Sequence, residues 1–429
     1  MKTRLLLLLA ANAFFVACSN EEVAETSTPM PKIQKVSSIR SYEEALQIAQ
    51  SSIQMVDGQA QTRAASPRKI ALNESKVCKL DAKTRTSSDV NDTLMYVFNF
   101  EDNQGFAVVS ARKSQALLAI AEEGYYDPNE EQECKNFEYV MELAKQYVLS
   151  AEDANPQNSR FGDPIGLIVE EYTYTVLNSK GNFITVNWGE AGIEASQCSN
   201  GFVGSSNLAT AMLLSYYSYP TYIDLNYSGM NFSDYPLDWT AIKVHAVGHS
   251  SNSTNCNATT SAHNSIAYLC RQIGELSSST YNSQYTATSQ TGTSSALASL
   301  GYNCSTLSYN QSLVNQYLDI NRPLIISGES NFSRYVWLLD GYQYCAVTVS
   351  EIAYYPDGTY AFVSHMLLDN SYYNHFNWGK NGDYNGYYLA GIFDMSEPRP
   401  NNNYEPLLPF PLETNFSSNV VMFYTYPNI

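Results

Sequence analysis

The chain has 429 residues, with 24 lysines and arginines against 42 aspartates and glutamates, so its formal net charge is -18. A chain of this length is expected to form about two domains. The negative charge, with no basic run beyond the first residues, argues against nucleic acid as a partner. Charged residues make up only 15% of the chain and tyrosines number 34, a composition that suits an exported protein better than a cytosolic one.

The first residues are typical of an export signal. Met1–Arg4 is basic, and the apolar stretch after it ends in Ala17, directly before Cys18. This stretch is shorter than the roughly 18 to 20 residues that span a bilayer, which disfavours a permanent transmembrane helix. Its end resembles a bacterial lipobox, in which the cysteine is diacylated and becomes the first residue of the mature protein; a signal peptide cut elsewhere is the alternative.

The lipobox interpretation predicts a signal peptide over residues 1–17 and a polar tether over residues 18–32. A protein of this kind would be an exported lipoprotein, anchored to a membrane through the lipid on Cys18. We expect it in the bacterial cell envelope, at the outer membrane or the cell surface.

Residues 33–150 predict a small α+β domain. Ser41 with Glu44 forms a capping-box pattern at the start of a helix. Residues 94–100 and 106–111 are apolar, β-prone runs separated by a polar turn, which predicts a hairpin. A second helix is indicated by one apolar face, formed by Phe137, Val140, Met141, Ala144 and Val148.

Residues 151–164, rich in Asn, Asp, Gly and Pro, predict a linker before a second domain over residues 165–429. The most helix-like part of this domain is residues 201–219. Two stretches rich in Ser, Thr and Asn, residues 250–265 and 277–295, are expected to be surface loops. Buried strands are expected at residues 336–339, 361–368 and 387–392, bounded by the turn pairs Asp340-Gly341, Asp357-Gly358 and Asn385-Gly386.

The cysteines and histidines give no sign of a metal site. Without Cys18, seven cysteines remain, scattered and with no C-x-x-C pair, so at least one thiol stays unpaired if no partner chain intervenes. His245 and His249 are four residues apart, but no acidic ligand pattern accompanies them. We expect no metal and no cofactor.

Several short motifs follow one another over most of the chain. They are Tyr96-Val97-Phe98-Asn99, Gly105–Ser110, Val186-Asn187-Trp188-Gly189, Gly204–Pro220, Arg322–Gly328, Asp340-Gly341-Tyr342, His375-Phe376-Asn377-Trp378-Gly379 and Asn385-Gly386-Tyr387. Their joint order resembles the streptopain family of papain-like cysteine peptidases, which are made as zymogens with an inhibitory propeptide. The resemblance implies an α+β papain-like fold, with a helical subdomain and an antiparallel β-sheet subdomain, preceded by a small α+β propeptide domain.

The resemblance places the catalytic cysteine at the start of the central helix, where this chain has no cysteine. An ungapped alignment through Tyr219-Pro220 puts the nucleophile position on Ser205, and an alignment on Ala209-Thr210-Ala211 puts it on Asn207. Ser205 is either a remnant nucleophile or the N-cap of the helix, a position that serine favours. A serine nucleophile also needs a base with a pKa near 7.

The other catalytic positions of the family are changed as well. The family's histidine, five residues before its Asp-Gly pair, falls on Tyr335, and the glycine before it falls on Arg334. The glutamine that binds the oxyanion falls on Glu190, whose negative charge would repel that oxyanion. A tyrosine, with an ordinary pKa of about 10, is poorly matched as a base, and Tyr335 is alternatively a packed aromatic residue.

Neighbouring residues complete the expected cleft. Asn377 and Trp378 match a segment that flanks the family's active site. His375, in the same segment, is expected to be scaffold, with a relocated base as the alternative. Cys198 could in principle reach the cleft, although a structural or disulfide-bonded thiol is expected there.

The sequence therefore predicts a member of the streptopain family whose catalytic site is degenerate. We expect an exported pseudopeptidase lipoprotein that binds a peptide or protein in its cleft. One alternative is a divergent active peptidase that uses Ser205 or a relocated residue. Another is a surface binding lipoprotein whose first domain inhibits an active relative.

Overall fold

A computed structural model of the chain describes residues 39–58, 68–79, 93–113, 115–150, 167–227, 230–244, 259–329, 333–354, 360–393 and 420–428. The expected signal peptide, tether, Cys18 and linker 151–164 lie outside the described residues. In the parts of the chain that are described, no helix is long and apolar enough to span a membrane.

The N-terminal domain, described from Ile39 to Ser150, confirms the local predictions. Ser41 and Glu44 form a capping box at the start of α1, the predicted hairpin is β2 and β3, and the apolar face of α3 is buried. The elements are α1 (Tyr42–Ser52), α2 (Gln54–Asp57), η1 (Leu72–Glu74), β1 (Lys76–Lys79), β2 (Thr93–Asn99), η3 (Glu101–Asn103), β3 (Phe106–Ser110), β4 (Leu117–Ala121) and α3 (Lys135–Ser150).

The C-terminal domain, described from Leu167 onward, has a helical part and a sheet part. Its first elements are β5 (Leu167–Gly181), α4 (Ser205–Tyr217), β6 (Tyr222–Tyr227), β7 (Met230–Pro236), α5 (Trp239–Val244), α6 (Thr260–Leu276), β8 (Thr280–Tyr281), β9 (Thr286–Ala287) and α7 (Gln290–Ser299). They are followed by β10 (Tyr302–Ser308), α8 (Gln311–Asp319), β11 (Leu324–Glu329), β12 (Arg334–Tyr354), β13 (Tyr360–Asn377), β14 (Gly386–Leu389), η4 (Ala390–Ile392) and β15 (Val421–Pro427).

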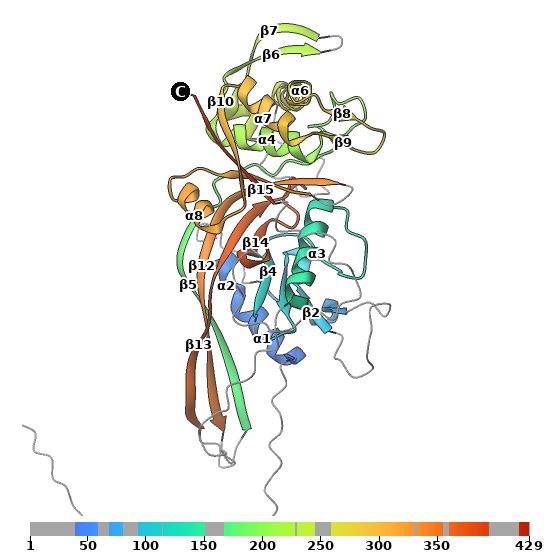
Figure 1. The fold of residues 1–429 in the computed structure, drawn as a ribbon. Coiled ribbons are helices and arrows are strands. Elements are labelled where there is room, and N and C mark those ends of the chain that lie inside the picture. Colours follow the sequence, from blue (N-terminus) through green and yellow to red (C-terminus); the bar gives the residue numbers. More distant parts are fainter. Residues whose placement is uncertain are drawn as a thin grey trace, which may run out of the picture. The chain divides into compact units, whose positions relative to one another are not determined.

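One antiparallel sheet passes through both domains (Figure 1). Its strand order is β1-β2-β3-β4-β14-β13-β12-β11-β15-β10, and β5 also pairs with β12. The junction between the domains is the pairing of β4 with β14, where Gly386 lies opposite Ala121. The small N-terminal sheet is thus extended by the strands of the C-terminal domain.

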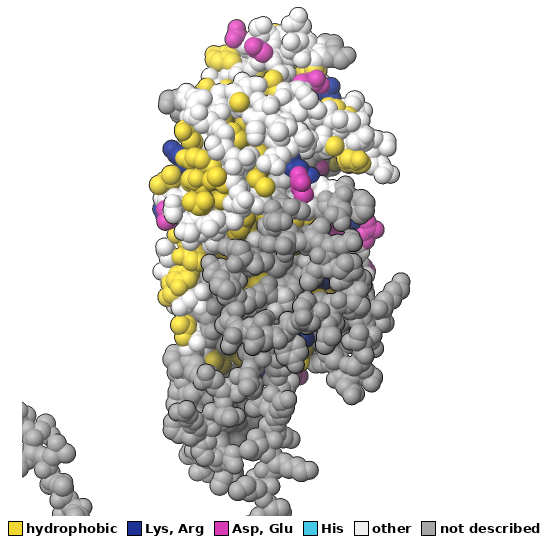
Figure 2. Space-filling view, viewed as in Figure 1, with side chains coloured by type: hydrophobic (Ala, Val, Ile, Leu, Met, Phe, Trp, Pro, Cys, Tyr) yellow, Lys and Arg dark blue, Asp and Glu magenta, His cyan; other side chains and the backbone are white. Residues whose placement is uncertain are grey.

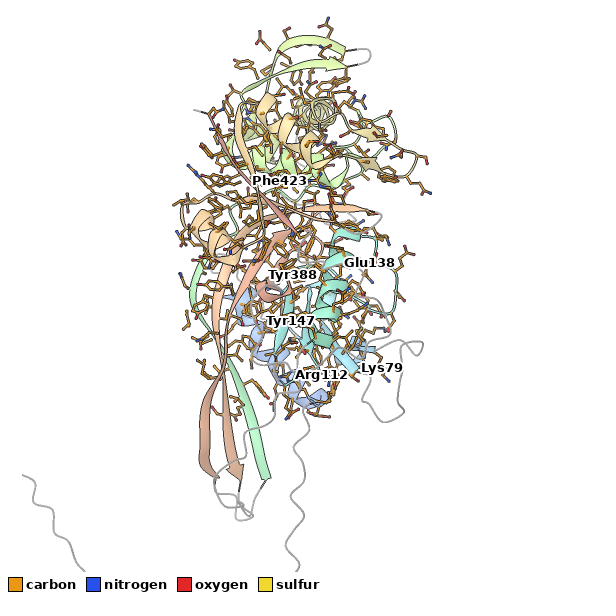
Figure 3. The ribbon with its side chains drawn as sticks, in the orientation of Figure 1. Lys79, Arg112, Glu138, Tyr147, Tyr388 and Phe423 are labelled. Atoms are coloured by element: carbon orange, nitrogen blue, oxygen red, sulfur yellow. The ribbon has the colours of Figure 1, made fainter. Side chains whose placement is uncertain are left out.

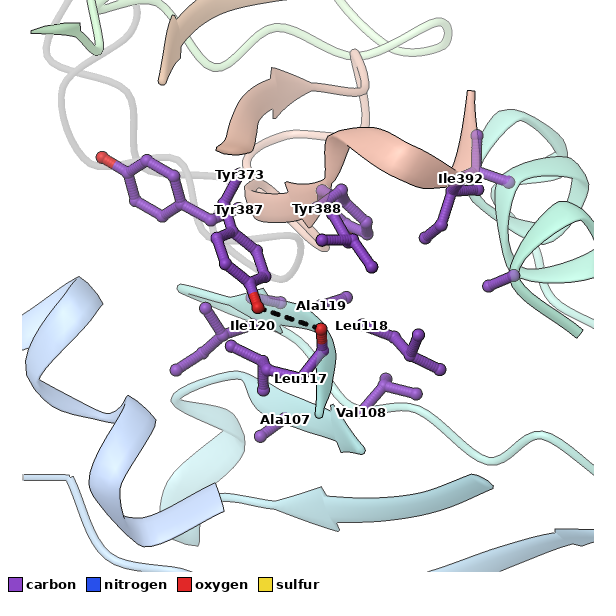
Figure 4. Packing of buried hydrophobic residues seen from close by; sticks show 14 of the residues in the cluster. Ala107, Val108, Leu117, Leu118, Ala119, Ile120, Tyr373, Tyr387, Tyr388 and Ile392 are labelled. Carbon is purple, nitrogen blue, oxygen red and sulfur yellow. Dashed lines mark hydrogen bonds between the residues drawn. The ribbon is translucent and has the colours of Figure 1, made fainter. Parts of the chain in front are cut away.

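The sheet and α3 share a hydrophobic core that draws residues from both domains. Figure 4 shows Leu117 and Ile120 of β4 close to Tyr373, Tyr387 and Tyr388 of β13 and β14. The Tyr373 hydroxyl donates a hydrogen bond of 3.2 Å to the Leu117 carbonyl. Each large side chain buried in this way contributes about 2 kcal/mol, so the two domains stabilise one another.

A second core forms around α4, with α6 and α7 beside it. It joins residues such as Leu213, Ile266 and Leu297, all fully buried. Figure 2 shows mostly uncharged side chains on the described surface of one face, with acidic and basic residues only at intervals, as the low content of charged residues implies.

Three predictions of loops and turns were wrong. Residues 260–265 begin α6, because the Thr259 side chain accepts a hydrogen bond from the backbone N–H of Ala262 and so caps a helix. The stretch 277–295 contains β8, β9 and the first half of α7. Asp340-Gly341 lies inside β12 rather than in a turn, at a register shift of the β12–β13 pair.

Candidate functional site

Ser205 is the first helical residue of α4, one position later than the expected N-cap. The N-cap is Gly204, whose φ of 86° suits glycine, and no side chain caps this helix end. A Cβ atom on Gly204 would lie 2.7 Å from the Thr286 carbonyl oxygen. Close packing and a positive φ therefore select glycine at the cap, and Ser205 follows it half-buried.

Asn207, the other candidate for the nucleophile position, has a structural role. It is buried, and its amide donates hydrogen bonds of 3.0 Å to the Val203 carbonyl and to the Ser279 hydroxyl. Its amide oxygen accepts one of 3.1 Å from the Ser277 hydroxyl. These bonds join the head of α4 to the segment that follows α6.

Tyr335 lies at the start of β12 and stacks on Tyr139 of α3. The two ring centroids are 4.7 Å apart, with an angle of 19° between the planes. Gly328, opposite Tyr335 on β11, makes room for the stack, because a Cβ atom there would lie 2.4 Å from the Tyr139 ring. The position assigned to the histidine thus holds an aromatic ring packed against the N-terminal domain.

Arg334 connects β12 to the helical part of the domain. Its guanidinium donates hydrogen bonds to the Ser327 hydroxyl at 2.7 Å and to the Thr288 carbonyl at 2.9 Å. It also contacts the Thr293 hydroxyl, which lies 2.6 Å from the Ser206 hydroxyl of α4. Burial lowers the pKa of Arg334 to about 10. A cation held by these contacts replaces the glycine that the family resemblance implies.

Glu190 lies beside Lys380 and Cys134. Burial raises the pKa of Glu190 to about 7, although the positive charge of Lys380 opposes this rise. Burial also raises the pKa of Cys134 to about 12, and the nearby Glu190 carboxylate adds to the rise. Cys134 is therefore a neutral thiol at pH 7, and Glu190 cannot donate a hydrogen bond to an oxyanion once it ionises.

His375 is held between two carboxylates inside the protein. Its Nδ1 atom lies 2.6 Å from Oδ1 of Asp340, and its Nε2 atom lies 3.7 Å from Oε1 of Glu122. Burial lowers the pKa of His375, but Asp340 and Glu122 raise it more, to about 10. The imidazole is therefore protonated at neutral pH, which does not suit a general base. The sequence did not reveal this pairing with Asp340, because the two residues come from different strands.

Asn377 and Trp378 are packed parts of the same region. Asn377 donates a hydrogen bond of 3.0 Å to the Val186 carbonyl and accepts one of 3.1 Å from the Gly379 N–H. The Trp378 indole donates one of 2.9 Å to the Tyr384 carbonyl. Both side chains are buried, so their contacts orient the backbone.

The start of α3 and the residues just before it contact several of these regions. Figure 3 shows Glu138 near the start of α3 and Tyr147 further along it. The contacts are Glu133 with Lys380 at 3.0 Å, Cys134 beside Glu190, Asn136 donating to the Val336 carbonyl at 2.9 Å, Phe137 edge-on to Trp378, and Tyr139 on Tyr335. The start of α3 therefore packs against the surroundings of Glu190, Tyr335 and Trp378.

Burial raises the pKa of five of the described cysteines, Cys134, Cys198, Cys270, Cys304 and Cys345, and so disfavours a replacement thiolate there. Cys78, Cys134, Cys198, Cys270, Cys304 and Cys345 are not disulfide-bonded. Burial raises the pKa of Cys198 to about 11 and that of Cys345 to about 12. Among the described residues, no three His, Cys, Asp or Glu side chains are grouped as a metal site.

A cavity of about 700 Å³ lies elsewhere, between the N-terminal domain and the Asp383-Tyr384 pair. Its lining includes Glu122, Glu123 and Asp127 and contains mostly acidic or polar side chains. Ser205 and Tyr335 are not part of this lining. The cavity is thus distinct from the site at the head of α4.

Comparison with protein families agrees with this architecture. Residues 187–388 match the peptidase C10 family, and residues 32–148 match the Spi protease inhibitor family. Residues 187–388 are therefore assigned to the peptidase C10 family, the streptopain family, and residues 32–148 to the Spi inhibitor type. The resemblance and the α+β papain-like fold predicted from the sequence are confirmed.

Two solved structures of Prevotella intermedia proteins were also found. A fragment of prointerpain A, in a mutant form, is 20% identical, and the match covers 81% of this chain and 98% of that chain with a TM-score of 0.49. The active wild-type interpain A cysteine protease is 18% identical, with 58% and 95% covered and a TM-score of 0.35. A search of curated proteins found no match.

Replacing His375 by Gln should destabilise the protein by about 3 kcal/mol at pH 6, because the buried Asp340 loses its charged partner. The folded-state pKa of about 10 lies above the ordinary value of 6.5. The stabilisation by His375 is therefore complete below pH 6.5 and is lost as the pH rises to about 10. Urea unfolding of both proteins at pH 6, 8 and 10 should show a shrinking difference. The control is His263→Gln, at a half-buried position of α6. A difference in stability between the wild type and His375→Gln that does not change with pH would contradict the protonated state assigned to His375.

Proposed function

We propose that this protein is a pseudopeptidase of the streptopain family, without proteolytic activity. In this proposal the cleft that the family resemblance implies around Ser205, Tyr335 and Glu190, called the groove below, binds a protein segment instead of cleaving it. In the covered state, that segment is the start of α3 in the same chain. A separate peptide or protein would bind the groove when the start of α3 moves away from it. The observation that carries the proposal is the stack of Tyr139 on Tyr335, at the position of the missing histidine.

Two requirements of cysteine-peptidase chemistry bear on the proposal. A nucleophile needs a thiolate or an activating base, and Ser205 has no cysteine beside it in sequence and no imidazole in the family's histidine position. The oxyanion needs a hydrogen-bond donor, and Glu190, with its pKa raised to about 7, can donate only while it is protonated. Losing groups of this kind typically removes several orders of magnitude from the rate.

Catalysis by a relocated base is less well supported. His375 is the candidate, but its contacts to Asp340 and Glu122 keep it protonated. A protonated imidazole can donate a proton but cannot take one from Ser205. The pseudopeptidase is therefore the better proposal.

The site of action that we propose is the bacterial cell envelope. The basic start, the apolar stretch and Ala17 before Cys18 support export followed by lipidation. A single diacylated cysteine would hold the protein at the outer membrane or the cell surface. The ligand that we propose is then a peptide or protein met at that surface.

The purified protein should not cleave casein, and it should not react with a thiol-directed peptidyl probe at the groove. Ser205→Ala should behave like the wild type, because Ser205 has no base to activate it. Casein cleavage is measured as the release of fluorescent peptides from labelled casein over several hours. Cleavage by the wild type that disappears in Ser205→Ala would sink the proposal.

Tyr139→Ala should uncover the groove and raise its affinity for peptides. The change removes the ring that stacks on Tyr335, and such an aromatic pair contributes about 1 kcal/mol beyond its buried area. We expect binding of fluorescent casein peptides to strengthen about fivefold or more, measured by polarisation. Glu142→Ala, an exposed change on the same helix, is the matched control. Equal binding by both variants and the wild type would count against a peptide-binding groove.

Cys18→Ser should abolish incorporation of labelled palmitate and move the protein from the membrane fraction to the soluble fraction. Serine cannot form the thioether that lipidation of the cysteine requires. Cys304→Ser, which changes a partly buried thiol in the second domain, should leave labelling intact. Palmitate labelling that persists in Cys18→Ser would refute the lipoprotein assignment.

A further inference from the structure

We infer that the N-terminal domain of this protein is a permanent structural part of the fold, and that the C-terminal domain does not separate from it as a mature unit. This goes beyond the proposed function, because an inactive peptidase could either keep or shed its N-terminal domain. It also differs from the zymogen that the family resemblance implies, in which the propeptide is a removable inhibitor.

The first support is the pairing of backbone between the domains. β4 pairs with β14 through Gly386 opposite Ala121, Tyr387 opposite Ile120 and Tyr388 opposite Ala119. Removing the N-terminal domain would expose this edge of β14, together with the buried Tyr387 and Tyr388 side chains. An exposed apolar edge strand invites aggregation, so the C-terminal sheet depends on β4 as its cover.

The second support is the strand that leads from one domain into the other. β5 pairs with β12 from Leu167 opposite Tyr354 to Gly181 opposite Gly341, so it is built into the C-terminal sheet. The N-terminal domain also packs on this strand. Ser51 of α1 donates a hydrogen bond of 2.7 Å to the Tyr172 carbonyl, and Gln54 of α2 donates one to the Tyr174 carbonyl.

Side chains strengthen the contact with β5. Tyr172 and Tyr174 are buried, whereas Thr173 and Thr175 between and beside them are exposed. The Tyr174 hydroxyl accepts a hydrogen bond of 3.0 Å from the Leu117 N–H of β4. On the next strand, Gln343 of β12 donates one of 2.8 Å to the Met55 carbonyl of α2. The segment that joins the domains is thus held by both of them.

The third support is a set of polar groups whose partners come from the opposite domain. Asn136 of α3 donates to the Val336 carbonyl at 2.9 Å. Glu122, at the end of β4, lies 3.7 Å from the buried His375. If the N-terminal domain left, Val336 would lose this bond, and the imidazolium would lose one of its two carboxylates. Leaving such buried groups unpaired costs free energy, and this cost opposes separation of the two domains.

The test begins with the full-length protein, carrying a recognition sequence for a site-specific protease between Ser150 and Leu167. After complete cutting, the sample is analysed by gel filtration without denaturant and by thermal unfolding. We expect both fragments to elute together at the volume of the uncut protein. They should also unfold in one transition, within about 5 °C of the uncut protein. Release of the N-terminal fragment, with the C-terminal fragment still folded and eluting alone, would overturn the inference.

Variants at the contact sharpen the test. Tyr174→Phe removes the hydroxyl that accepts from Leu117, and Tyr174→Ala removes the whole buried ring. On dilution of the cut protein, the concentration at which half of the complex dissociates should rise at least tenfold for Tyr174→Ala, and less for Tyr174→Phe. Thr175→Ala, an exposed change on the same strand, should leave it unchanged. If Tyr174→Ala does not fold, the phenylalanine variant decides the outcome.

Casein cleavage by the same cut samples separates this inference from the proposed function. Fragments that separate without gaining activity would contradict the permanent domain and leave the pseudopeptidase standing. Fragments that stay together while the protein cleaves casein would contradict the pseudopeptidase alone.

Discussion

The long strand β12 is the constraint on which the other features depend. Its first residues pair with β11 and carry Arg334 and Tyr335, and its remainder lies between β5 and β13. A strand that is paired on both sides cannot slip by one residue without exchanging its buried and exposed faces. Tyr335 is therefore fixed against α3, and Asp340 is fixed against His375. Position 335, to which the sequence assigns the family's histidine, and the contact between the domains therefore belong to one strand.

Only 15% of the residues are charged, yet Asp340, His375 and Glu122 form a row of charged side chains, of which the first two are buried. Asp340 is fully buried and also accepts a hydrogen bond of 2.9 Å from the Ile184 N–H. His375 stands between Asp340 and Glu122, so the imidazolium balances carboxylates from two domains. A buried charge is tolerated when its partners are present and is costly when one is removed. The three charged side chains of Asp340, His375 and Glu122 thus favour one relative placement of the two domains over others, in addition to any net stabilisation of the fold.

Local features of the fold could be predicted from the sequence, and the contacts at the site could not. The capping box of Ser41 and the apolar face of α3 depend on residues within one or two turns of a helix, so a sequence window contains them. The helix α6 was missed because its cap, Thr259, lies in a stretch rich in Ser, Thr and Asn, and this composition is also typical of loops. The pairs Asp340–His375 and Tyr139–Tyr335 join different strands or domains, and no local pattern encodes them. The order of the family motifs along the chain located Tyr335, but it did not show that the Tyr139 ring stacks on Tyr335.

In the pseudopeptidase that we propose, the replaced catalytic residues and their contacts support one another physically. A histidine at position 335 would bring a group that titrates near neutral pH to a contact with α3, whereas Tyr335 offers a flat ring that stacks on Tyr139. Burial beside Cys134 shifts the pKa of Glu190 to about 7, so this carboxyl need not remain charged under the cover. Arg334, where the family resemblance implies a glycine, ties β12 to Thr288 and to Thr293 of α7, and the Thr293 hydroxyl contacts Ser206 of α4. In the proposed pseudopeptidase, Tyr335 and Glu190 therefore suit contact with the start of α3, and Arg334 suits a fixed link between β12 and the helical part of the domain.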